Sequence, residues 1–227
     1  MFIFILALIF IRPFIPSLAL PYFNFLYSAL FLLSLFLWII VKKADLSAMH
    51  ELKYPLVLFS LALFLSFLLS DNKTSGLKDA FNYISGIMLL ITASSFDLNN
   101  KKNILRIVIL AGFIVSLLAI HQYFFGLKHT LDYMHKTEIA DPFAISYLTR
   151  KRAFFPFITP NILASYLIIV IFLALENKRR LFILPFLFFA LLLTKSMGGL
   201  LSLFLALMVY FYLKKKVKRE KSLLLLM

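Results

Sequence analysis

Long apolar runs alternate with short polar segments along most of the chain. A helix that crosses the hydrocarbon core of a bilayer needs about 20 apolar residues. The runs suited to this role are Asn24–Val41, Tyr54–Ser70, Leu77–Phe96, Ile104–Phe125, Pro160–Leu175, Leu181–Leu193 and Gly198–Leu213. A further run, Met1–Ile11, stops at Arg12-Pro13 and reaches Leu20 only across a proline kink. The pattern predicts an all-α fold, a polytopic integral membrane bundle of about eight spans, because backbone left unpaired in lipid excludes open strands.

Composition supports this interpretation. Of the 227 residues, 63% are hydrophobic and 27 are phenylalanine, which is more apolar surface than a soluble domain can bury. The first residues, "MFIFILALIFIRPFIP", lack the basic segment and the small-residue cleavage site of a signal peptide. The chain has no cysteine, so a disulfide framework and a thiolate metal site are both excluded.

The basic residues predict how the spans are oriented. Lys and Arg number 24 against 10 Asp and Glu, and the net charge of +14 falls mainly between the apolar runs. Such a distribution is explained by membrane topology, so no nucleic-acid partner is expected. If the N-terminus lies in the cytoplasm, most of the basic residues do too, including the tail "KKKVKREK". We therefore expect a multi-pass protein of the bacterial inner membrane with both termini in the cytoplasm.

One predicted outer loop, residues 126–153, departs from that charge rule. It ends in three adjacent cations, Arg150, Lys151 and Arg152, on the side where topology does not require them. An ordinary solvated loop end would explain them. The alternative is an anion-binding rim at the outer face of the membrane.

Two predicted helix starts favour the anion-binding alternative. Thr159 is suited to an N-cap and Pro160 to the first helical position, and Asn161 could add an amide donor. The helix that follows runs from outside to inside, so its free N–H groups and the positive end of its dipole face outward.

The second start lies in "LLLTKSMGGLLSL", residues 191–203. Here a short span is expected to emerge outside and turn tightly from Lys195 to Gly199, with Ser196 as N-cap and Gly198-Gly199 permitting the turn. Together with Arg152, the two starts would form a site for a membrane-held diphosphate. Against this, every helix must end somewhere, and an interfacial lysine can simply extend toward water.

These residues also resemble a known family. "RAFFPFITPNILASYL", residues 152–167, resembles the R-x-F-x-T-F-x-x-P-N-x-L-A-x-Y-L signature of the O-antigen ligase and O-antigen polymerase superfamily. "LTKSMGGLLSL" resembles that family's L-T-x-S-R-G-x-x-L-x-L element, in the expected order. The resemblance covers about residues 150–213.

The resemblance implies a membrane glycosyltransferase. Members take a glycan from an undecaprenyl diphosphate carrier at the periplasmic face and pass it to an acceptor, either lipid A–core or a growing polysaccharide, without cofactor or metal. Partners would be the undecaprenyl-diphosphate-linked glycan, the acceptor lipid or glycan, and membrane lipids. Arg152, Pro160 and Asn161 match the first signature, and Ser196, Gly198 and Gly199 match the second. Together with the cations and the N-cap described above, the expected residues are Arg150, Arg152, Asn161, Lys195 and Ser196 at the carrier diphosphate, with Thr159, Pro160, Gly198 and Gly199 as structural elements of the motif.

The chain departs from the family in two ways. Met197 stands where the family usually has an arginine, and a lysine such as Lys195 is not equivalent to a guanidinium. The family also continues into a large periplasmic loop with an essential histidine and a further arginine. We therefore expect an incomplete chain in three parts: 1–149, spans and outer loop; 150–213, the signature region; and 214–227, a basic cytoplasmic tail and possible start of another span.

The catalytic residues stay unassigned at this stage. His121, His129 and His135 are expected near the outer face and could supply a base, although interfacial histidines more often serve packing, and their spacing does not favour a zinc site. Two other function classes remain open: a non-catalytic remnant or membrane scaffold, which Met197 favours, and a transporter, which would require internal symmetry that we do not find.

Overall fold

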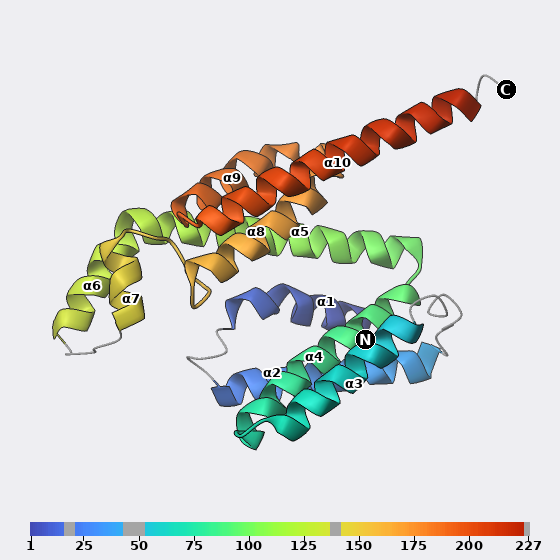
Figure 1. Cartoon of the computed structure of the whole chain (residues 1–227), viewed down its shortest axis with the longest axis horizontal. Coiled ribbons are helices and arrows are strands. Elements are labelled where there is room, and N and C mark those ends of the chain that lie inside the picture. The colour runs from blue at the N-terminus through green and yellow to red at the C-terminus, as the bar shows by residue number, and fades with distance from the viewer. Residues whose placement is uncertain (16–20, 43–52, 137–141, 225–227) are drawn as a thin grey trace. The chain divides into compact units, whose positions relative to one another are not determined.

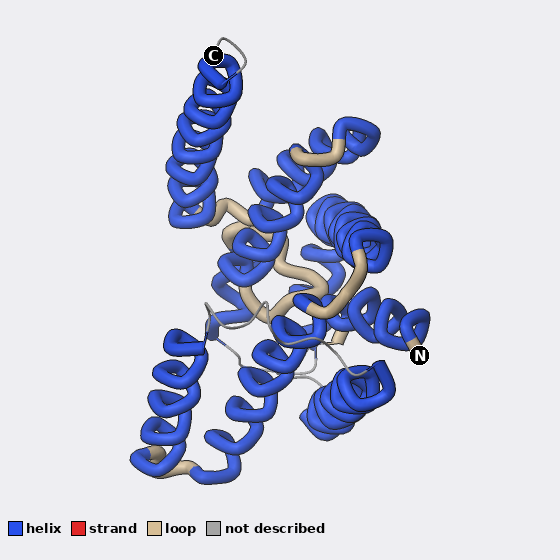
Figure 2. Tube along the Cα trace, turned by 90° about the vertical axis from the view of Figure 1, so that its right-hand side faces the viewer, coloured by secondary structure: helices blue, strands red, loops and turns tan. Residues whose placement is uncertain are grey.

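The computed structural model describes residues 1–15, 21–42, 53–136 and 142–224, and within these ranges the chain is helical without strands. Figure 2 shows helices joined by short loops. The chain packs as two compact units, Met1–Ala111 and Gly112–Met227, each with its own interior. The predicted all-α fold is confirmed.

In its described residues, the first unit contains helices α1 to α4 and the beginning of α5 (Figure 1). Its elements are α1 (Phe2–Ile11), the short η1 (Arg12–Phe14), α2 (Pro21–Lys42), α3 (Lys53–Leu69), α4 (Lys73–Ser94) and the start of α5 (Leu98–His121). Helix α2 packs on α1 and α4, and α3 packs on α4. Aromatic rings fill part of the interior: Trp38 lies 5.7 Å from Phe2 and 5.1 Å from Phe96, measured between ring centroids.

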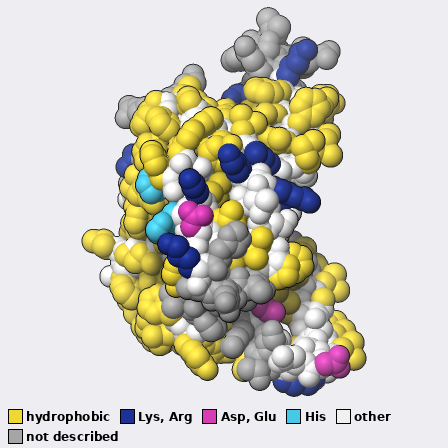
Figure 3. Space-filling model, turned by 90° about the vertical axis from the view of Figure 1, so that its left-hand side faces the viewer, with side chains coloured by type: hydrophobic (Ala, Val, Ile, Leu, Met, Phe, Trp, Pro, Cys, Tyr) yellow, Lys and Arg dark blue, Asp and Glu magenta, His cyan; other side chains and the backbone are white. Residues whose placement is uncertain are grey.

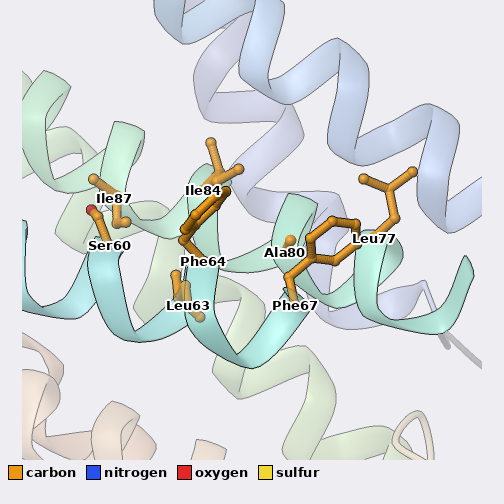
Figure 4. A pocket seen from close by; sticks show the side chains of 8 residues that line it. All are labelled: Ser60, Leu63, Phe64, Phe67, Leu77, Ala80, Ile84 and Ile87. Atoms are coloured by element: carbon orange, nitrogen blue, oxygen red, sulfur yellow. The ribbon is translucent and has the colours of Figure 1, made fainter. Parts of the chain in front are cut away.

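An apolar groove follows the seam between α3 and α4 (Figure 4). It encloses about 350 Å³. Its lining residues recur at helical spacing on one face of each helix, Ser60, Leu63, Phe64 and Phe67 on α3 and Leu77, Ala80, Ile84 and Ile87 on α4. The described residues that line the groove carry no charge, so it does not suit the diphosphate expected from the sequence.

The second unit contains the rest of α5 and everything that follows. Its further elements are the π-helical turn η3 (Gln122–Gly126), α6 (Leu127–Lys136), α7 (Pro142–Thr149), α8 (Pro160–Leu175), η4 (Lys178–Ile183), α9 (Leu184–Leu193) and α10 (Met197–Leu224). Helix α8 packs on α9 and α10, and α6 packs on α7. Figure 1 shows α8, α9 and α10 lying alongside one another.

Helix α8 is the centre of this second unit. Leu163, Leu167 and Ile171 on α8 are completely buried. Two glycines, Gly112 of α5 and Gly199 of α10, let their helices approach α8 closely. A Cβ atom added to Gly112 of α5 would lie 2.4 Å from Val170, a distance that real Cβ atoms do not show. The backbone of α5 therefore packs directly against the side of α8.

Among the described residues, three helices are long and apolar enough to cross a membrane: Tyr22–Val41, Leu98–Met134 and Met197–Lys215. Shorter apolar helices lie at Phe2–Phe14, Lys53–Leu69, Pro160–Leu175 and Leu181–Leu193. Hydrophobic side chains dominate the face drawn in Figure 3. These features are those of a membrane protein. The expected number of eight spans stays a prediction, because α4 belongs to neither group and the shorter helices fall below spanning length.

The predicted outer loop, residues 126–153, is a helical hairpin in its described parts. In α6, Leu127 and Met134 lie on one side of the helix and pack against Leu148 of α7. Lys128 and Lys136 of the same helix are exposed. The sequence analysis assigned no helix to this segment, because α6 is too short and polar to stand out as a span, although its apolar positions repeat at helical spacing. Its place outside the membrane stays a prediction.

Candidate functional site

Helix α8 begins as the sequence predicts. Thr159 has extended backbone angles, φ −130° and ψ 150°, and its hydroxyl accepts a hydrogen bond from the amide of Ile162 at 3.3 Å. Pro160 occupies the first turn and is buried. Because proline has no N–H, it loses nothing at a position whose amide has no partner within the helix. The predicted N-cap is confirmed.

Helix α10 begins after a turn that differs from the predicted one. Ser196 caps it, since its hydroxyl accepts from the amide of Gly199 at 3.2 Å, as predicted. The turn itself is made at Lys195, whose φ of 48° is left-handed. The expectation that Gly198-Gly199 form the turn was wrong, because both residues lie inside α10.

The two glycines of α10 have different surroundings. A Cβ atom on Gly198 would meet no atom within 4 Å. A Cβ atom on Gly199 would lie 2.8 Å from the Cβ of Ala164 on α8. Gly199 therefore allows the beginnings of α8 and α10 to pack side by side, and that contact positions the rest of the site.

Asn161 connects the two sequence motifs. Its Oδ1 accepts one hydrogen bond from Nη2 of Arg152 at 3.1 Å and another from the hydroxyl of Ser196 at 2.9 Å. A guanidinium can only donate, so the amide oxygen rather than the NH₂ group must face Arg152. The donor role expected for the NH₂ group of Asn161 stays a prediction. The oxygen holds the cluster together, and the NH₂ group takes no part in these two bonds.

Arg152 is fixed from two further directions. Its Nε donates to the backbone carbonyl of Thr194 at 3.0 Å, and its Cζ lies 5.5 Å from the ring centroid of Tyr147. The side chain is half-buried. The two hydrogen bonds use two of the five N–H groups of the guanidinium, so donors remain for an anion.

Lys195 reaches the same segment from the turn before α10. Its Nζ donates to the backbone carbonyl of Arg150 at 3.1 Å and lies 5.9 Å from the ring centroid of Tyr123. Arg150 thus enters the cluster through its carbonyl, and its side chain is exposed. The left-handed backbone of Lys195 and of Lys151, with φ of 49°, costs about 1–2 kcal/mol at each residue. Such outliers concentrate at functional sites.

The electrostatic character of this end of the unit is positive. The first turns of α8 and α10 meet at the bond between Asn161 and Ser196, so the positive ends of two helix dipoles lie together. Glu176 lies at the opposite end of α8, where it accepts from the hydroxyl of Tyr210 at 2.6 Å. The arrangement can bind an anion through helix amides, a guanidinium and an ammonium group.

The sequence reasoning missed Gln122, Tyr123, Tyr147 and Thr194. Gln122 is 8% exposed, and its Oε1 accepts from the amides of Phe154 and Phe155, both at 2.9 Å. A polar residue within the apolar run ending at Phe125 was a usable signal. The partner that it binds could not be identified from the sequence.

The histidines whose side chains the structure describes form no hydrogen bond with this cluster. His121 is exposed, with its ring 5.3 Å from that of Phe125, and His129 is exposed on α6. The side chain of His135 lies outside the described residues. In the described part of the chain, no group of His, Asp and Glu side chains could hold a metal ion.

Comparisons with known proteins give no relative for this chain: no family model, no curated protein and no solved structure matches it. The chain is a membrane protein with a cationic cluster at the shared start of α8 and α10.

Proposed function

We propose that the chain binds an undecaprenyl-diphosphate-linked glycan at the periplasmic face of the bacterial inner membrane and transfers the glycan to lipid A–core or to a growing polysaccharide. The diphosphate of the carrier lies against Arg152, Lys195 and the first turns of α8 and α10. Arg150, whose side chain is exposed, extends the cationic rim. In this proposal the chain belongs with the O-antigen ligases and polymerases that its two motifs resemble.

The observation that carries the proposal is the pair of hydrogen bonds at Asn161. They join Arg152 and Asn161 of the first motif to Ser196 of the second, across 35 residues of sequence between Asn161 and Ser196. Two motifs that resemble one family would have no reason to meet in an arbitrary arrangement of helices. Their meeting supports a shared site with positive charge.

The chemistry follows from the charge of the leaving group. An acceptor hydroxyl attacks the anomeric carbon of the glycan, the bond from that carbon to the diphosphate oxygen breaks, and the diphosphate leaves on its carrier. The hydroxyl proton passes to a base. Cations held at the diphosphate stabilise the negative charge that develops on it, which is the largest contribution that a preorganised site can make. We assign no catalytic base.

Arg152→Ala tests this proposal. In the full chain reconstituted in nanodiscs, we expect the variant to bind undecaprenyl diphosphate about 10- to 100-fold more weakly, because hydrogen bonds to charged groups contribute about 1.5–3 kcal/mol. Glycan transfer should fall with it, while membrane insertion is unchanged. Lys128→Ala is the matched control, since it removes the same charge from an exposed position on α6. Equal binding by the wild type and Arg152→Ala contradicts the proposal.

The proposed topology has eight spans with both termini in the cytoplasm. It rests on the distribution of basic residues and on helices found at each predicted position. The chain has no cysteine, so a single cysteine at position 152 gives an unambiguous label. A reagent that cannot cross the membrane should label it from the periplasm. Labelling only from the cytoplasm contradicts the proposed orientation.

A second candidate is a non-catalytic membrane scaffold. The observation that favours it is Met197, which is 79% exposed at the first position of α10, where the resembled motif has an arginine. A scaffold would neither bind the diphosphate carrier nor transfer a glycan. The binding experiment on the wild type therefore separates the two candidates.

A further inference from the structure

The segment that carries Arg152 is held by one buried side chain from a distant part of the sequence. The amides of Phe154 and Phe155 both donate to Oε1 of Gln122 at 2.9 Å. A side-chain amide oxygen has two lone pairs, so these two bonds use its full capacity. Gln122 is 8% exposed, and water is a poor substitute for it as an acceptor at this place.

The two amides before Phe154 are bound to backbone carbonyls. Arg152 N–H donates to Tyr147 at 2.9 Å, and Ala153 N–H donates to Leu193 at 3.0 Å. Four successive amides of the segment therefore have partners. Only the last two depend on a side chain, so a single substitution can release half of these bonds without altering the segment itself.

The next residue along the chain reaches the other cation of the cluster. The ring centroid of Tyr123 lies 5.9 Å from Nζ of Lys195. The ring also packs against the small core of α6 and α7, which includes Leu127 and Leu148. A cation near an aromatic face is attracted by the ring quadrupole, so Tyr123 favours the position of the Lys195 ammonium group beside its ring.

Both residues lie in the π-helical turn Gln122–Gly126, where α5 gives way to α6. Single π-turns within helices are frequent at functional sites. Here the turn supplies adjacent residues to two separate segments of the site, the segment before α8 and the turn before α10. The helix continues from α5 through the π-turn into α6, so the continuity of the helix does not itself require the turn.

We propose that Gln122 and Tyr123 are positioning residues that hold Arg152 and Lys195 at the separation required by a lipid-linked diphosphate. This inference rests on the proposed function. Gln122 acts through the backbone that carries Arg152, and Tyr123 acts directly on the ammonium group of Lys195. Neither touches the diphosphate. A small displacement of a charged group is costly in a site whose role is to meet a fixed pattern of charge.

Hydrogen exchange tests the structural half of the proposal without any ligand. In the full chain in nanodiscs, Gln122→Met should accelerate exchange of the amides of Phe154 and Phe155 by at least about tenfold, because both lose their acceptor. Gln122→Glu keeps an acceptor at the same place, and the two amides should stay protected. Unchanged exchange in Gln122→Met overturns the role of Gln122.

Binding of undecaprenyl diphosphate tests the functional half. Gln122→Met should raise the Kd about tenfold, since the displaced guanidinium loses its alignment with the anion. Tyr123→Leu should raise it about threefold, while Tyr123→Phe, which keeps the ring, restores the wild-type Kd. Phe125→Leu is the matched control from the same turn, because Phe125 is 71% exposed and its ring contacts His121 rather than the cluster. Thermal unfolding of each variant identifies any general loss of structure.

The outcomes distinguish this inference from the proposed function. If the wild type binds and Gln122→Met loses amide protection yet keeps its Kd, the positioning role is wrong and the proposed function stands. If the wild type does not bind the diphosphate lipid, the proposed function fails and the positioning role falls with it. If Tyr123→Phe binds as weakly as Tyr123→Leu, the ring is not what holds Lys195.

Discussion

Two arginines, one in each unit, make nearly the same contact. Nη1 of Arg12 donates to Oδ1 of Asn24 at 3.0 Å, and Nη2 of Arg152 donates to Oδ1 of Asn161 at 3.1 Å. The two asparagines differ in exposure. Asn24 is 7% exposed within α2, whereas Asn161 is exposed at the start of α8. The same pair of residue types is therefore enclosed in one unit and open in the other.

A tyrosine ring accompanies each arginine. The Cζ of Arg12 lies 5.6 Å from the ring centroid of Tyr27, and the Cζ of Arg152 lies 5.5 Å from that of Tyr147. Tyr27 is 5% exposed, and its hydroxyl donates to the carbonyl of Leu8 at the end of α1. In the first unit the group thus ties α1 to α2, which is a structural role.

The second unit uses its copy of this contact differently. Asn161 accepts a second bond from Ser196, and Lys195 adds a second cation. Asn161 and Lys195 are exposed there, although Ser196 is buried. An arginine–asparagine hydrogen bond therefore does not by itself indicate a function. The burial of the pair and the donors beside it distinguish a structural link from a binding site.

The largest expected effect is a difference in the free energy of unfolding between variants of Asn24 and Asn161. Asn24→Leu should lower the free energy of unfolding by about 2–3 kcal/mol, because it leaves the half-buried guanidinium of Arg12 with only a long bond of 3.5 Å to the carbonyl of Ile15. Asn161→Leu should lower that free energy by a smaller amount, about 0.5–1.5 kcal/mol, since it removes the bonds from Arg152 and Ser196 at an exposed position where water replaces part of the loss. Denaturant unfolding in detergent micelles measures both. Equal destabilisation by the two variants would remove the distinction between a buried link and an open site.

A second test compares glycines in the two units. Gly199→Ala should destabilise the second unit by about 1–3 kcal/mol, because the new methyl group would overlap Ala164 and push α10 away from α8. Gly86→Ala in α4 of the first unit should stabilise by about 0.5–1 kcal/mol, since a Cβ there meets nothing within 4 Å.

Gly198→Ala is the nearest control for Gly199→Ala. It lies one residue away in the same helix, and its Cβ would also be in open space. We expect a small gain in thermal unfolding temperature. A loss as large as that of Gly199→Ala would mean that the two helix starts do not depend on close packing at Ala164.

Met197→Arg should sharpen the binding side of the comparison. The substitution places a guanidinium at the exposed first position of α10, beside the cations already present. We expect the Kd for undecaprenyl diphosphate to fall about three- to tenfold, the effect of one added charge-assisted hydrogen bond at an exposed site. Met197→Lys should gain less, because an ammonium group cannot bind two phosphate oxygens side by side. No gain from either substitution would place the anion elsewhere.

The smallest expected effect concerns backbone strain. In the described part of the chain, the non-glycine residues with positive φ are Lys151 and Lys195, both in the second unit. Lys151→Gly should raise the free energy of unfolding by about 1 kcal/mol, since glycine adopts this conformation without the steric cost. The exposed side chain of Lys151 is outside the bonded cluster, so the Kd should change little. A decrease in stability would show that the left-handed turn is not strained.

Much of the local structure followed from the sequence. The N-caps at Thr159 and Ser196 and the proline at the first position of α8 were all predicted and all confirmed. These features depend on residues within one helical turn of each other, so a short stretch of sequence contains all the information that they need. Helices also lie at each predicted span, although their number as spans stays a prediction.

Errors arose where a local signal had two readings. Gly198-Gly199 can make a turn or lie within a helix, and packing against α8 selected the helix. Asn161 carries both a donor and an acceptor, and only the structure shows that its oxygen meets the guanidinium of Arg152. The segment of α6 is too polar for a span, and only its contacts with α7 made its helical spacing meaningful.

The sequence by itself determined the apolar helices, their caps and the excess of positive charge. Only the tertiary structure decided that Gln122 holds the segment after Arg152, that Arg152 meets Thr194, and that Asn161 meets Ser196. These bonds join residues 32, 42 and 35 positions apart. Periodicity and capping act within about four residues, whereas such distant bonds form only when close helix packing brings their partners together.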